Sequence, residues 1–192
     1  MSPSGPDPSS TYSDQDYITG VQHGDVVAFT ALVRAHIDPL TRFAYGFTGT
    51  EEAAHDIVQD VFARIWELRA DWSPKGSIAA YLFASIRHRA LNWIKANSAN
   101  QRMRDAFLAS MEQIRELDDP YNDVALTAAV HREVQRLTDR QREALRLRYE
   151  QGLTVPGVAE VLGIEVRPTE KLIARALGLL RSRLDRVRNA EE

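Results

Sequence analysis

The sequence predicts an all-α protein of two small helical domains joined by a linker, with a helix-turn-helix in the C-terminal domain. Apolar residues recur at three- and four-residue spacing over long stretches, which is the pattern of amphipathic helices. Sustained period-2 alternation, the signature of a half-buried strand, is missing from the 192 residues. The helical pattern weakens between residues 97 and 123, and this break separates the two predicted domains.

Composition restricts the classes of protein to which the chain can belong. Hydrophobic residues make up 44% of it, enough for a packed core, and no apolar run of about 18 residues would span a membrane. Cysteine is absent, which excludes disulfides, thiol catalysis and cysteine-based zinc sites, and we expect a cytoplasmic location. The formal net charge is −3, whereas free-standing DNA-binding proteins are usually basic. Contact with nucleic acid would therefore need local basic patches or a partner that supplies positive charge.

Changes in composition along the chain set the expected domain boundaries. The first residues are rich in Ser, Pro and Gly and lack the basic and apolar stretches of a signal peptide, which predicts a disordered leader. Asn-Ser-Ala-Asn, followed by Asp-Asp-Pro, predicts a linker. The predicted units are the leader 1–13, an N-terminal helical domain 14–100, the linker 101–123 and a C-terminal helix-turn-helix domain 124–188.

In the N-terminal domain the apolar spacing predicts four helices and one loop. The strongest pattern lies in the third helix, where one face is apolar and the opposite face carries mostly charged residues. Trp, Pro and Gly residues mark the loop that follows it. The expected elements are a helix Asp25–His36, a second helix that begins after Pro39 and is closed by Gly46 and Gly49, a third helix Glu51–Leu68, the loop Arg69–Ser77 and a fourth helix Ile78–Ala96.

Capping signals divide the C-terminal domain. Thr138 and Gln141 form a capping box, in which each side chain satisfies a free backbone N–H of the helix start. Thr154 is expected to cap a short helix, and Pro156 is tolerated in the first turn of that helix. The expected helices are Val124–Arg136, Asp139–Gln151 ended by Gly152, a short helix ended by Gly163, and a long last helix with Pro168 near its start.

The last two helices have the faces that a helix-turn-helix requires. Ala159 and Leu162 of the short helix are expected to pack against Leu172, Ile173 and Ala176 of the long one. The second helix of such a motif enters the DNA major groove with its N-terminal residues at the base edges. Spacing alone fits an ordinary αα-hairpin with a solvated basic face equally well. The basic residues expected to point outward are Arg167, Lys171 and Arg175.

A basic stretch without any acidic residue covers 86–104, and aromatic residues interleave with it. Cations that follow phosphates and aromatic rings on which bases stack are the parts of a single-strand-binding groove. For Phe83 and Trp93, however, we favour positions in the core. The loop Trp72–Ser77 is a better place for a pocket that accepts a base flipped out of its stack.

The helix Glu51–Leu68 carries a polar face of Asp56, Gln59, Asp60, Arg64 and Glu67. Such a face can bind a partner helix or can simply be solvated, and periodicity does not decide between the two. The five histidines have no metal-ligand spacing, and no Gly-rich phosphate loop or nucleophile elbow occurs. We therefore expect no enzyme activity, no cofactor and no metal site.

These motifs resemble those of extracytoplasmic-function sigma factors, a group of RNA polymerase sigma factors. Ala54–Trp66 resembles the helix with which the family binds core RNA polymerase, and Tyr81–Lys95 is similar to the stretch that melts and recognises the −10 element. The family usually has Asn at the position of His88. Leu137–Tyr149, followed by Ala159–Ile164, resembles the −35-binding domain.

The resemblance implies a sigma factor that binds core RNA polymerase and directs promoter-specific initiation, with duplex −35 DNA, single-stranded −10 DNA and an anti-sigma factor as further partners. It implies that the linker runs toward the polymerase active site. The residues implied for polymerase binding are Asp56, Gln59, Asp60, Arg64 and Glu67. Those implied for the −10 element are Trp72, Lys75, Ser77, Arg87, His88, Arg89, Asn92 and Lys95. Those implied for the −35 element are Arg167, Pro168, Thr169, Lys171 and Arg175.

The chain departs from the family in its recognition helix. Glu165 and Glu170 stand where the family commonly has Ser and Lys, and both repel phosphate. Gly157 replaces a better helix former in the preceding helix, at a cost of up to about 1 kcal/mol. One alternative is therefore a sigma-like protein that binds polymerase or an anti-sigma factor without −35 recognition. Another is a helix-turn-helix repressor, whose duplex binding would be salt-sensitive and independent of polymerase.

Overall fold

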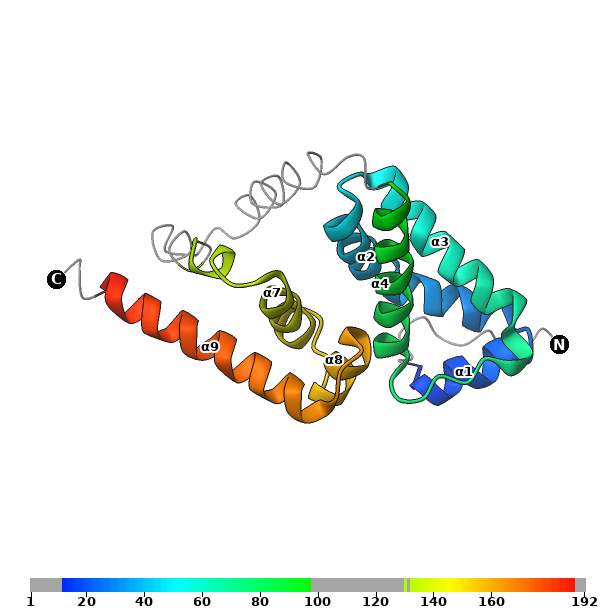
Figure 1. The fold of residues 1–192 in the computed structure, drawn as a ribbon. Helices are drawn as coiled ribbons and strands as arrows, with labels where there is room; N and C mark the ends of the chain where they lie inside the picture. Colours follow the sequence, from blue (N-terminus) through cyan, green and yellow to red (C-terminus); the bar gives the residue numbers. More distant parts are fainter. Residues whose placement is uncertain (1–11, 98–129, 131, 189–192) are drawn as a thin grey trace.

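A computed structural model describes residues 12–97, 130 and 132–188, and this part of the chain is helical without any strand (Figure 1). The predicted linker, most of the predicted leader and the first turns of the helix expected at 124–136 lie outside the described residues. None of the described helices is long and apolar enough to cross a membrane. The helices are α1 (Asp14–Gln22), α2 (Val26–Thr48), α3 (Glu51–Glu67), α4 (Ile78–Ala96), α7 (Asp139–Leu145), α8 (Val155–Leu162) and α9 (Val166–Arg188).

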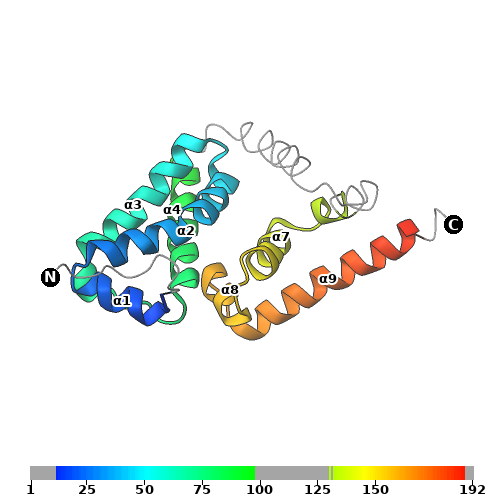
Figure 2. The ribbon, with the colours of Figure 1, turned by 180° about the vertical axis from the view of Figure 1, so that it is seen from behind.

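The N-terminal domain is built on α2, α3 and α4, which pack side by side (Figures 1 and 2). The predicted third and fourth helices are confirmed, and α4 has the expected bounds. Ring contacts connect the helices: Phe43 of α2 lies edge-on to Phe83 of α4 at 5.0 Å, and Phe29 lies edge-on to Phe62 of α3 at 6.3 Å. Such aromatic contacts add to the stabilisation from buried apolar area.

Helix α2 corrects the prediction of two helices separated at Pro39. It is one helix of 23 residues with Pro39 inside it, closed at Gly49 with a φ of 72°. Pro39 has no N–H to donate to the carbonyl of Ala35, and an internal proline costs about 3 kcal/mol or more. Leu32 and Leu40, on either side of the proline, are both fully buried in one core. Continuous burial therefore outweighs the local preference to break the helix.

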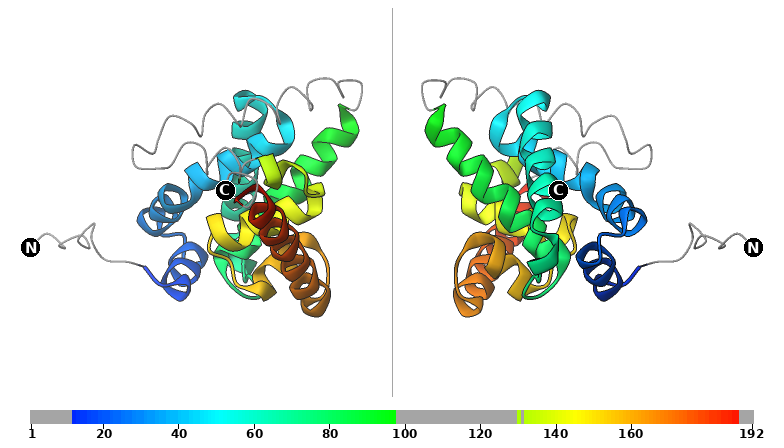
Figure 3. Two further views of the ribbon diagram at one scale, coloured as in Figure 1. Left: turned by 90° about the vertical axis from the view of Figure 1, so that its left-hand side faces the viewer. Right: turned by 90° about the vertical axis from the view of Figure 1, so that its right-hand side faces the viewer.

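Helix α1 was missed by the apolar pattern, although a capping box marks its start. The Ser13 hydroxyl accepts a hydrogen bond from the Asp16 N–H, and the Asp16 carboxylate accepts one from the Ser13 N–H. Helix α1 lies beside the first turns of α2 (Figure 3). A Cβ on Gly20 would lie 2.5 Å from the Cβ of Ala28. Only glycine lets the two helices approach this closely.

In the C-terminal domain the predicted caps are confirmed. Thr138 and Gln141 form the capping box of α7, Thr154 caps α8, and Gly163 ends α8 with a φ of 64°. The helix expected at 139–151 differs in its last turn, because Arg146–Glu150 is π-helical. Together α8 and α9 form the predicted helix-turn-helix, and four of the five predicted contact residues are buried, while Leu172 is half-buried.

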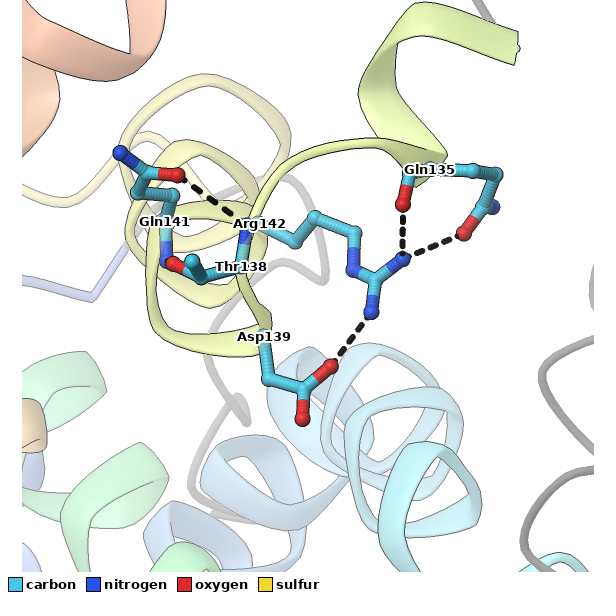
Figure 4. A network of polar contacts seen from close by, with 5 residues as sticks. All are labelled: Gln135, Thr138, Asp139, Gln141 and Arg142. Carbon is cyan, nitrogen blue, oxygen red and sulfur yellow. Dashed lines mark hydrogen bonds and ion pairs between the residues drawn. The ribbon is translucent and has the colours of Figure 1, made fainter.

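Arg142 ties α7 to the segment before it (Figure 4). Its guanidinium donates to the backbone carbonyl of Gln135 at 2.9 Å and to the side-chain oxygen of Gln135 at 2.6 Å. It also pairs with the Asp139 carboxylate. These bonds fix the turn that precedes α7, and they orient the C-terminal domain's first described helical residues relative to α7.

His36 gives the packing of α1 a pH dependence. Burial lowers the pKa of His36 below its ordinary value of about 6.5, and its ring lies edge-on to Tyr17 of α1 at 6.4 Å. The unfolded chain therefore takes up a proton more readily, so the free energy of unfolding should fall as the pH drops below 6.5, with a slope of at most about 1.4 kcal/mol per pH unit. His36→Phe should reduce this slope in urea melts between pH 7.5 and 5.5. His55→Phe, at an exposed position of α3, should retain it; an equal loss in both variants would contradict the assignment to His36.

Candidate polymerase- and DNA-binding surfaces

The predicted polymerase-binding residues all lie exposed on one side of α3. The apolar face of this helix is buried in the domain core, with Ile57, Val61 and Ile65 at its centre. Among the polar residues, Arg64 and Glu67 form an exposed ion pair at 3.1 Å, a type of contact that contributes little to stability. The exposed residues of this surface are Asp56, Gln59, Asp60, Arg64 and Glu67.

An ion pair connects this surface to α4. Arg89 Nη1 lies 3.0 Å from a carboxylate oxygen of Asp60. The residues predicted for polymerase and for −10 DNA thus meet at the α3–α4 contact. From the sequence, Asp60 and Arg89 are predicted for separate sites, because their 29-residue separation gives no local signal.

Helix α4 carries an exposed polar face beyond that pair. His88, Asn92 and Lys95 are exposed and lie at i, i+4 and i+7, on one side of the helix. Phe83 is buried, as expected, and Trp93 is half-buried against the core. The aromatic rings of α4 therefore serve packing, while its polar side chains are the groups available to a strand.

Only some of the residues predicted for the −10 element are exposed in the loop before α4. Lys75 and Ser77 are exposed, and the Ser77 hydroxyl caps α4 by accepting from the Ala80 N–H at 3.1 Å. Trp72 corrects the prediction: its side chain is buried, edge-on to Tyr81 at 6.1 Å, because the apolar ring completes the core under the loop. A buried ring cannot stack on a base, so Trp72 forms the base of the loop.

Arg87, also predicted for the −10 element, faces α7 in this structure. Its guanidinium points to α7, where it forms a two-pronged contact with Glu143 at 2.7 and 3.4 Å. Their side chains are 21% and 14% exposed, so the pair is largely shielded from water. In this arrangement Arg87 is not available to DNA. The partner is 56 residues away, and nothing in the local sequence indicates it.

The two domains are in contact, and Gly157 lies where they meet. Helix α8 packs on α4 beside α7 (Figures 1 and 2). A Cβ on Gly157 would lie 3.4 Å from the Cβ of Ala80. The core is continuous from α4 into α8, with Leu82 and Val158 in one cluster. A Cβ would just fit at position 157, but a larger side chain would meet α4 there.

Most of the residues predicted for the −35 element are exposed on α9, the second helix of the helix-turn-helix. Arg167, Lys171 and Arg175 follow each other at four-residue spacing on the exposed side, and Pro168 is exposed beside them. Thr169 is a correction: it is fully buried, and its hydroxyl donates to the Glu165 carbonyl at 2.9 Å. It shares the inner face with Ile173 and Ala176, at i, i+4 and i+7, and so belongs to the contact with α8.

Two family models match the chain in the order of the two domains. Sigma-70 region 2 matches residues 32–100, and Sigma-70, region 4 matches residues 127–180. Among similar proteins, the RNA polymerase sigma factor CnrH of Cupriavidus metallidurans is 30% identical, over 90% of this chain and 95% of its own length.

Solved structures agree with the fold. The structure of CnrH in complex with the cytosolic domain of CnrY matches with a TM-score of 0.57 and 27% identity, over 93% of this chain and 99% of that one. The sigma factor RpoE of Bartonella quintana, solved with the anti-sigma factor NepR, matches with the same TM-score and 18% identity, over 83% of this chain and 98% of that one. At that identity the second match supports the fold alone.

The structure has the two domains in contact, with α8 packed on α4, and we call this the closed arrangement. The contact at Gly157 allows it to be tested. Gly157→Leu should separate α8 from α4, because a larger side chain has no space beside Ala80. Gly178→Leu is the matched control, since nothing lies within 4 Å of a Cβ there. The chain has no cysteine, so fluorophores placed on Glu52→Cys and Arg181→Cys would report the distance between domains. We expect lower energy transfer for Gly157→Leu only, with helix content unchanged. Equal transfer in both variants would mean that the contact does not hold the domains together.

Proposed function

Because the chain belongs to the sigma-70 family, with the two-region layout of its extracytoplasmic-function group, we propose that it binds core RNA polymerase and directs it to specific promoters. The observation that carries this proposal is the junction of two surfaces at the Asp60–Arg89 pair. An exposed polar face of α3 suits a protein partner, and the adjacent polar face of α4 suits a DNA strand. One domain can thereby hold the melted strand against the polymerase.

In the proposed complex the N-terminal domain, 14–100, contacts polymerase through α3 and the −10 strand through α4 and the loop before it. Lys75, His88, Asn92 and Lys95 are the exposed groups that support this assignment. The C-terminal domain, 124–188, places α9 in the −35 major groove. The linker 101–123 joins them along the polymerase. The net charge of −3 fits this scheme, because polymerase supplies much of the DNA affinity.

We infer that an anti-sigma protein holds the chain in the closed arrangement. The structurally similar sigma factor CnrH was solved with the cytosolic domain of CnrY bound to it. In this chain Arg87 is covered by α7, so a partner that stabilises the contact between domains would keep it from DNA. Members of the family supply specificity rather than catalysis. The protein is therefore proposed to act inside the cell, without cofactor or enzyme activity of its own.

Polymerase binding can be tested on α3. Asp56→Ala combined with Gln59→Ala should weaken binding to core polymerase by about 10- to 100-fold, since truncation of central contact residues costs roughly 1–3 kcal/mol. Both side chains are exposed, so the melting temperature should not change. Glu52→Ala, at an exposed position in the first turn of the same helix, is the control. Unchanged affinity of the double variant in a titration of labelled protein with core polymerase would contradict the proposed surface.

Recognition of the −35 element can be tested on α9. Arg167→Ala combined with Lys171→Ala should reduce transcription from promoters selected by the reconstituted holoenzyme by at least about tenfold, because each lost contact costs roughly 1–3 kcal/mol. Arg181→Ala, exposed further along α9, should have little effect. The loss should disappear on templates whose −35 sequence is scrambled. If the double variant transcribes as the unmodified protein does, the alternative of a sigma-like protein without −35 recognition is favoured, as Glu165 and Glu170 suggest.

A further inference from the structure

Helix α1 precedes the part of the chain that matches Sigma-70 region 2, which begins at residue 32. It nevertheless contacts both ends of the α3–α4 loop, defined here as residues 72–77. This loop contains Lys75 and Ser77, both exposed and both predicted for the −10 element. The contacts span 50 and 64 residues, so they could not be predicted from local sequence.

The first contact is at the end of the loop, where α4 begins. A carboxylate oxygen of Asp14 accepts a hydrogen bond from the Ile78 N–H at 2.8 Å. Ile78 is the first residue of α4 and is fully buried, so its N–H would otherwise lack a partner within the helix. A carboxylate at a helix N-terminus is also attracted by the helix dipole. Asp14 therefore holds the loop's exit in place.

The second contact is at the start of the loop. The side-chain amide of Gln22, at the other end of α1, donates to the Trp72 carbonyl at 3.0 Å. The Trp72 ring is buried below the same position. Backbone and side chain of this residue are thus both fixed, and α1 spans the loop from entry to exit.

Helix α1 is rigid enough to act as such a support. Val21 is fully buried, and the Gly20–Ala28 approach and the Tyr17–His36 ring contact attach the helix to α2. A loop whose ends are held by a packed helix loses less conformational entropy when it binds a ligand.

We propose that α1 positions the α3–α4 loop for the unpaired −10 base, with Asp14 and Gln22 as positioning residues that do not themselves touch DNA. This inference rests on the proposed sigma-factor function. It assigns to α1 a share in promoter selectivity, which is separate from any share in polymerase binding. The two hydrogen bonds fix both ends of the loop, so the exposed Lys75 and Ser77 between them keep a constant position relative to α4.

The test uses the full chain assembled with core polymerase. Its promoter is first selected from random DNA, and the holoenzyme is then titrated with fork DNA whose single-stranded −10 segment carries either the preferred base or an abasic site. Asp14→Ala combined with Gln22→Ala should reduce the preference for the base over the abasic site by about tenfold, corresponding to about 1.4 kcal/mol. Affinity for core polymerase should stay within about twofold.

Two further variants separate positioning from general damage. Asp14→Asn retains an acceptor oxygen, so it should preserve most of the preference, and Gln15→Ala, exposed on the same helix, should preserve all of it. Hydrogen exchange gives a second measurement that does not depend on DNA. The Ile78 amide should exchange faster in Asp14→Ala, while amides in the middle of α4 should not change.

The outcomes are distinguishable. Equal loss of affinity for base and abasic DNA, or unchanged Ile78 exchange together with unchanged preference, would overturn the positioning role and leave the sigma-factor function intact. Failure of the unmodified holoenzyme to select any promoter would overturn the proposed function, and this inference with it.

Discussion

The burial of α4 is the constraint on which the rest of the structure depends. Leu82 and Ile86 pack into the core that α2 and α3 form, while Ala80 meets Gly157 of α8 on another side. Only a narrow strip of α4 remains exposed, and it contains His88, Asn92 and Lys95 at helical spacing. Because the helix is held on several sides, the position of this strip relative to α3 is fixed by packing rather than by polar contacts.

Charge is distributed so that each basic side chain of α4 facing a neighbouring element finds a carboxylate there. Arg89 pairs with Asp60 at the surface, and Arg87 pairs with Glu143 in a half-buried position. An arginine fork binds a carboxylate and a phosphate with similar geometry. If Arg87 contacts −10 DNA as the family resemblance implies, a DNA phosphate would take the place that Glu143 occupies here. Opening the domains near DNA would then exchange one anion for another, which costs far less than exposing an unpaired charge.

The sequence predicted what depends on neighbours three or four residues away and failed where distant residues decide. Helices α3 and α4 and the capping box at Thr138 followed from local signals. The helix break predicted at Pro39 is wrong, because burial of apolar residues on both sides of the proline outweighs the local cost of a proline inside a helix. The family resemblance implies a DNA contact for Thr169, whereas its helical register with Ile173 places its side chain in the core. Pairs such as Arg87–Glu143 cannot be predicted from the local sequence, because their two residues lie far apart in the chain. Most of the fold was therefore predictable, but only part of the candidate site was.

The closed arrangement and the proposed function require different separations of the two domains. The −35 and −10 elements are about 25 base pairs apart by their names, and at about 3.4 Å per base pair this is roughly 85 Å of duplex. Domains of about 100 residues have radii of gyration near 13 Å, so two domains in contact cannot reach both elements. A fully extended linker over residues 101–123 could reach roughly 80 Å, close to the distance required. The contact of Gly157 with Ala80 and the Arg87–Glu143 pair must therefore break before both promoter elements are bound. Helix α8 meets α4 at Gly157 and Ala80 and through an apolar core that includes Leu82 and Val158, while the Arg87–Glu143 ion pair joins α4 to α7. In the proposed complex, the surfaces of α4, α7 and α8 that hold the two domains together would have to separate.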